Sequence, residues 1–73
     1  MKIYKSIYDD SYVRRIALIA ANDLAEAEAT AYESECGFLL DGTRVYPNAE
    51  DFIITEVKGV FSRSKKAEII EYI

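Results

Sequence analysis

The sequence predicts an α+β domain with β-β-α-β-β order, in which one helix packs on one face of a single antiparallel sheet. Three observations lead to this prediction. Two alternating apolar segments open the chain, a segment rich in alanine and glutamate follows them, and residues 52–61 are rich in β-branched and aromatic side chains. Periods of two and of 3.6 residues indicate strands and helices, and a helix on one face of an antiparallel sheet defines this class.

The first two strands are predicted to form a hairpin. Residues 2–8 alternate isoleucines with tyrosines, so Tyr4 and Tyr8 share one side of a strand whose other side carries the isoleucines. Residues 9–11 favour a turn. Residues 12–21 are rich in valine, isoleucine and leucine and predict a central strand. Because the turn is short, the two strands most simply pair with each other.

A helix is predicted over residues 23–36. Either Asn22 or Asp23 can cap its free amides, and Asp23 with Glu26 three residues later has the spacing of a capping box. Gly37 supplies a left-handed stop.

The inner face of this helix is expected to be shallow. Leu24, Ala27 and Ala31 recur at helical spacing, and small alanines let a helix lie close to a sheet.

The second half of the chain predicts two further strands. Residues 52–61 alternate as a strand, with Gly59 as a bulge. Residues 67–73 fit a helix or a strand, and we favour a strand that forms a hairpin with residues 52–61, because the connection over residues 62–66 is short. Residues 38–46 contain Asp-Gly, which favours a tight hairpin, and an irregular loop is the equal alternative.

Composition predicts one soluble domain, residues 1–73, that stays in the cytoplasm. The chain is 51% apolar and 30% charged. Its longest uncharged run, residues 16–22, is far shorter than the roughly 20 residues that cross a bilayer. Charged residues interrupt the first ten positions, so no secretory signal is expected. The single cysteine, Cys36, excludes an internal disulfide and is typical of a reducing compartment.

The residues available for chemistry do not predict an enzyme. There is no histidine, and nothing near Cys36 in sequence would activate it as a nucleophile. The glycines are isolated, so no phosphate-binding loop is present. Glutamates seven apart on the predicted helix lie about 10 Å from each other, too far to share a metal. We therefore expect no catalytic residue, no cofactor and no metal.

Acidity concentrates in the predicted helix. Residues 23–36 contain five acids and no base, namely Asp23, Glu26, Glu28, Glu33 and Glu35. Of 13 acids and nine bases in the chain, eight acids and all nine bases lie elsewhere, so the remainder nets one positive charge. The simple interpretation is a solvated helix face. The functional interpretation is a row of carboxylates that meets a basic partner and imitates phosphates.

Basic residues form a second, smaller feature at Arg14, Arg63, Lys65 and Lys66. They could contact nucleic acid, or they could protect a sheet edge from pairing with other chains. The net charge of −4 at pH 7 favours the protective role.

The layout resembles that of small phage and mobile-element proteins, among them anti-CRISPR proteins. The resemblance lies in the opening segment MKIYK, the strand ending IALIAAN, the alanine-glutamate helix after it and the closing hairpin. It implies a non-catalytic inhibitor that docks on a Cas protein or guide-RNA complex in the cytoplasm of a host cell.

The sequence therefore predicts a protein-binding module that blocks a basic nucleic-acid-binding surface. Its expected partner-binding residues are four helix glutamates and two tyrosine anchors, Glu26, Glu28, Glu33, Glu35, Tyr4 and Tyr8. The alternatives are a small nucleic-acid-binding protein and a self-assembling structural protein, and a homodimer is compatible with either.

Overall fold

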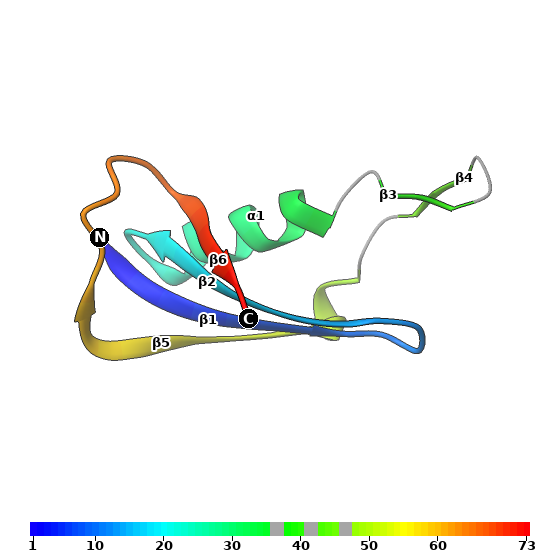
Figure 1. Ribbon diagram of the computed structural model, residues 1–73, viewed down its shortest axis with the longest axis horizontal. Helices are drawn as coiled ribbons and strands as arrows, with labels where there is room; N and C mark the ends of the chain where they lie inside the picture. The colour runs from blue at the N-terminus through cyan, green and yellow to red at the C-terminus, as the bar shows by residue number, and fades with distance from the viewer. Residues whose placement is uncertain (36–37, 41–42, 46–47) are drawn as a thin grey trace.

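The computed structural model of the chain describes residues 1–35, 38–40, 43–45 and 48–73. A four-stranded antiparallel sheet carries one helix on one face (Figure 1), so the predicted fold class is confirmed. The strand order is β5-β1-β2-β6. The elements are β1 (Lys2–Asp9), β2 (Arg14–Ala21), α1 (Leu24–Glu35), β5 (Phe52–Phe61) and β6 (Glu68–Tyr72).

Two short strands form a separate sheet. β3 (Phe38–Leu40) pairs antiparallel with β4 (Thr43–Val45), which confirms the hairpin rather than the irregular loop. The Asp-Gly dipeptide itself lies outside the described residues. A 3₁₀ helix, η1 (Ala49–Asp51), precedes β5 and was not predicted.

The β1–β2 hairpin forms as predicted, and one aspartate shapes its turn. β1 and β2 pair along their whole length, from Lys2 opposite Ala21 to Asp9 opposite Arg14. Asp10 Oδ1 accepts hydrogen bonds from the backbone N–H groups of Tyr12 at 2.7 Å and Val13 at 2.8 Å. These bonds keep both residues in the turn, so β2 begins two residues later than the pattern predicted.

The predicted cap starts α1. Asp23 Oδ1 accepts a hydrogen bond from the Glu26 backbone N–H at 2.8 Å, and Glu26 Oε1 accepts one from the Asn22 backbone N–H at 3.2 Å. The Glu26 amide, which the helix leaves free, is thereby satisfied, and the Glu26 side chain turns back to the residue before the cap. The helix ends at Glu35, and the predicted stop at Gly37 lies outside the described residues.

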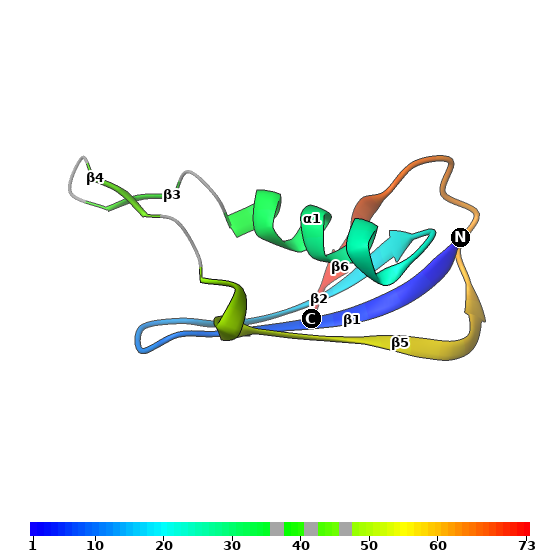
Figure 2. The same cartoon turned by 180° about the vertical axis from the view of Figure 1, so that it is seen from behind.

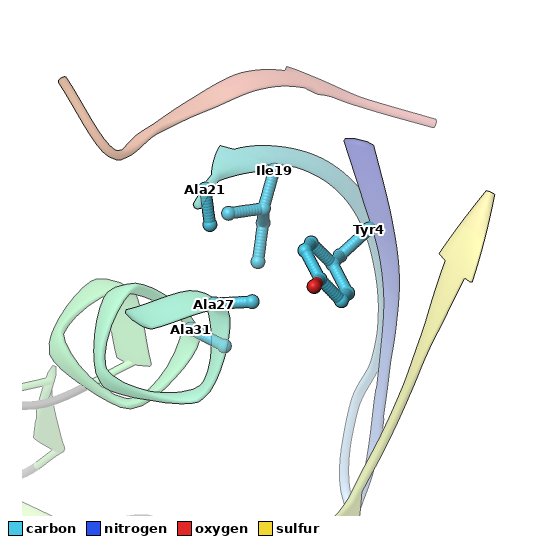
Figure 3. Packing of buried hydrophobic residues seen from close by; sticks show 5 residues of the cluster. All are labelled: Tyr4, Ile19, Ala21, Ala27 and Ala31. Carbon is cyan, nitrogen blue, oxygen red and sulfur yellow. The ribbon is translucent and has the colours of Figure 1, made fainter. Parts of the chain in front are cut away.

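The core lies between α1 and the sheet and is built from small side chains. Ala27 and Ala31 of α1 point at Tyr4 and Ile19 (Figure 3), and all four are at most 3% exposed. Leu24, which we expected on this inner face, is 46% exposed instead. The two alanines already hold the helix close to the sheet, so the first helical residue falls beyond the edge of the contact.

The last strand pairs differently from the prediction. β6 is a strand, but it pairs with β2 at the opposite edge of the sheet, and the expected hairpin with β5 is wrong. This position places Ile69 beside Ile19, where it packs on the core. The connection from β5 to β6, residues 62–67, is bound to the N-terminus at its first residue. Ser62 N–H donates to the Met1 carbonyl at 2.7 Å, and the Met1 ammonium donates to the Ser62 carbonyl at 2.8 Å.

A bulge interrupts β5 as predicted. The register between β1 and β5 shifts where Lys2 pairs with Phe61 while Ile3 pairs with Val57. Gly59 lies in the extra stretch with a φ of 81°, a left-handed conformation that glycine adopts without steric cost.

Removal of the Asp23 side chain tests whether it caps the N-terminus of α1. We expect Asp23→Ala to lower the free energy of unfolding by about 1 kcal/mol, because the Glu26 amide loses its acceptor. Glu33→Ala is the matched control, since it removes an exposed helix carboxylate that makes no cap. Urea unfolding followed by circular dichroism measures both. Equal losses in the two variants would contradict a capping role for Asp23.

Candidate functional site

The acidic residues of α1 do not form one row. At 100° per residue, Glu26 and Glu33 share the solvent side of the helix, opposite Ala27 and Ala31. Glu28 turns toward the flank of the helix, on the same side as Glu35. The helix therefore presents Glu26 and Glu33 on its solvent side, while Glu28 lies on a flank about 140° around the helix axis from Glu33.

Glu35 is neutralised within the chain. Its Oε2 lies 3.7 Å from Nε of Arg15, and its side chain is only 8% exposed. Arg15 lies on β2 opposite Tyr8, on the face that α1 covers. Glu35 thus contributes to holding the helix on the sheet, which corrects its assignment as a partner-binding residue.

The other three glutamates keep their charge available. Within the part of the chain that the structure describes, Glu26, Glu28 and Glu33 form no ion pair. Glu33 is exposed, while Glu26 and Glu28 are half-buried. Since Glu26 also serves the helix cap, Glu33 and Glu28 are the residues most free to contact a partner.

The two tyrosine anchors belong to the core. Tyr4 is 3% exposed and Tyr8 is 7% exposed, so neither can anchor a partner at the surface, and this prediction is wrong. Tyr8 packs on Phe52 with ring centroids 4.8 Å apart, and Phe52 in turn meets Tyr32 of α1. The tyrosine side of β1 faces the helix because aromatic rings fill the space that the short alanines leave.

A hydrogen bond between Tyr8 and Asp10 shifts both pKa values. The Tyr8 hydroxyl donates to Asp10 Oδ2. This bond, with burial and nearby negative charges, raises the pKa of Tyr8 to about 12 from 10.0. The same bond, helped by the backbone N–H groups of Tyr12 and Val13, lowers the pKa of Asp10 below its ordinary 3.8.

The basic residues do not come together. Arg14 begins β2 at the hairpin end, opposite Asp9. Arg63, Lys65 and Lys66 follow β5 at the other end of the sheet, just after Ser62, which bonds to Met1. Strand rise over the length of β2 separates these two ends by about 24 Å. One basic surface containing all four residues is therefore not formed.

The face of the sheet away from α1 is the feature that sequence reasoning missed. Residues that pair across neighbouring strands point to the same side of the sheet. We call the side away from α1 the outer sheet face. It consists of three rows, and each row has one residue from each strand, in the order β5, β1, β2, β6. The first row is Ile53, Ile7, Ile16 and Ile73, the second is Thr55, Lys5, Leu18 and Glu71, and the third is Val57, Ile3, Ala20 and Glu68.

Apolar side chains dominate this outer sheet face. Ile53 is 62% exposed and Ile73 is 71% exposed. None of the face packs against the cluster under α1, and in Figures 1 and 2 no described helix or strand lies against this side. The signal in the sequence was that both alternating sides of β1 and β2 are apolar, a pattern typical of strands covered on both faces.

The comparisons with known proteins identify no relatives. The chain matches no protein-family profile, no curated protein and no solved structure. Among the described residues, none of the helices has the length and apolar character needed to cross a bilayer, and no group of three or more acidic or cysteine side chains is placed to hold a metal ion.

The Tyr8–Asp10 bond predicts a pH dependence at both ends of the scale. Asp10 ionises more easily in the folded chain, so its contribution to stability is complete above pH 3.8 and is lost as the pH falls through its lowered pKa. Tyr8 resists ionisation when folded, so its contribution is lost as the pH rises from 10 toward 12. Asp10→Asn should weaken both dependences, and Tyr8→Phe should remove the alkaline one and weaken the acid one.

Urea midpoints measured across the pH range check this prediction. Asp9→Asn is the control, because it neutralises the neighbouring carboxylate without touching the bond. A profile of Asp10→Asn that overlays the wild-type profile in both acid and alkali would contradict the assignment.

Proposed function

We propose that this chain is a non-catalytic protein-binding module whose outward helix surface meets a basic partner. The outward helix surface comprises Glu26 and Glu33 on the solvent side of α1, together with Glu28 on its flank. One observation carries the proposal: these three carboxylates have no cationic partner among the described residues, whereas Glu35 on the same helix has Arg15. A carboxylate without its own counter-ion can form an ion pair with another molecule at little cost.

The partner that best fits this surface is a protein that normally binds nucleic acid. Such a protein exposes lysine and arginine side chains that bind phosphates. The carboxylates of a helix can form ion pairs with these side chains in place of the phosphates. The resemblance in layout to anti-CRISPR proteins makes a Cas protein, or its complex with guide RNA, the particular partner we propose. The chain would act in the cytoplasm of the host cell.

Interference with phage restriction tests this function. Strains that each carry one type of CRISPR-Cas system and a matching spacer are infected with the targeted phage, with and without the chain. We expect the chain to restore plaque formation in at least one type. Glu33→Lys should reduce the restoration, and Glu28→Lys with Glu33→Lys should reduce it by about tenfold or more, because like charges then face each other.

Glu50→Lys is the matched control for this experiment. It makes the same charge change as Glu33→Lys on an exposed residue of η1, outside the outward helix surface, and should leave inhibition intact. Restoration in no system would contradict the inhibitor function. Restoration that survives both helix reversals would contradict the electrostatic contact.

A further inference from the structure

The outer sheet face is too apolar to remain uncovered in a chain with so thin a core. Ile19 is the only large side chain under 2% exposed in the described residues, and small domains commonly gain stability by association. The face measures about 19 by 20 Å, or roughly 400 Å², because strands lie about 4.8 Å apart and residues rise about 3.4 Å each. Eight of its twelve residues are apolar, and the largest apolar patch on a monomer is often functional.

We propose that the outer sheet face binds the same face of a second copy of this chain, about a two-fold axis parallel to the strands. This arrangement reverses the strand order across the interface, so β5 of one copy faces β6 of the other and β1 faces β2. The row of isoleucines then meets itself, with Ile53 opposite Ile73 and Ile7 opposite Ile16. Face-to-face sheets pack in this way at a spacing of about 10 Å.

Charge complementarity selects a second copy over another partner. Lys5 lies in the interior of the face, between Ile3 and Ile7 along β1, and has no acidic partner within 4 Å among the described residues. Glu71 lies in the same row but on the other side of Leu18. Under the two-fold axis, Glu71 of one copy faces β5 of the other, which is the strand next to Lys5. Each dimer would thus gain two cross-interface ion pairs that a single copy cannot make.

The dimer would leave the outward helix surface free. α1 lies on the opposite side of the sheet from the outer sheet face (Figure 2), so the two helices of a dimer point away from each other. The inference is therefore independent of the proposed function. With about 800 Å² of projected surface buried in total, the interface belongs to the small class, and we expect a weak, reversible dimer.

Sedimentation equilibrium from about 1 μM to about 1 mM tests whether the dimer forms at all. We expect a reversible monomer–dimer equilibrium. Ile53→Lys should raise the dissociation constant at least about tenfold, because it places a charge in the isoleucine row of both copies. Tyr12→Lys is the matched control, since Tyr12 is 94% exposed at the hairpin turn and away from the face. A chain that stays monomeric throughout, or a dimer indifferent to Ile53→Lys, would overturn the proposal.

A charge exchange tests the orientation of the two copies. Lys5→Glu and Glu71→Lys should each weaken the dimer at least about threefold, and the variant carrying both should regain wild-type association. Repulsion between negatively charged chains alone predicts a different pattern, in which Glu71→Lys strengthens the dimer. That pattern, or a double variant no better than the singles, would overturn the two-fold arrangement. Circular dichroism of each variant verifies that the fold is retained.

Discussion

The contact between two alanines of α1 and the sheet sets the geometry of the whole molecule. Because the side chains of Ala27 and Ala31 are short, the helix lies close enough to the sheet for them to contact Tyr4 and Ile19. Larger side chains from the flanking strands then fill the margins of this contact, as Phe52 and Ile69 do. One helix of 12 residues can cover only one face of a four-stranded sheet in this way. The other face is left without a partner in the described chain.

This packing also decides which side chains remain available for binding. Tyr8 is drawn under the helix end, where it contacts Phe52 and donates a hydrogen bond to Asp10. Glu35, at the same end of the helix, pairs with Arg15. Tyr8 and Glu35, which the sequence predicted as partner-binding residues, thus hold β1 and α1 in place instead.

Among the described residues, two surfaces stay open to a partner, and they differ in chemistry and lie on opposite sides of the sheet. The outward helix surface carries negative charge with little apolar area, which favours rapid, salt-sensitive association with a basic partner. The outer sheet face carries apolar side chains around Lys5, with Glu68 and Glu71 at the β6 edge, which favours contact with a surface that is apolar and complementary in charge. A dimer formed through the sheet would display two helices at once, and a partner with two basic sites would bind it more tightly through effective concentration.

What the sequence determined by itself was local. The alternation in residues 2–8 and 52–61, the Asp23 cap and the bulge at Gly59 all depend on residues within a few positions of each other, and each was predicted correctly. Only the tertiary structure decided the partner of β6, the burial of the tyrosines and the pairing of Glu35 with Arg15, because these depend on which edges and faces meet after the chain has turned back. Periodicity shows that both sides of β1 are apolar, but it cannot show that a single helix covers only one of them.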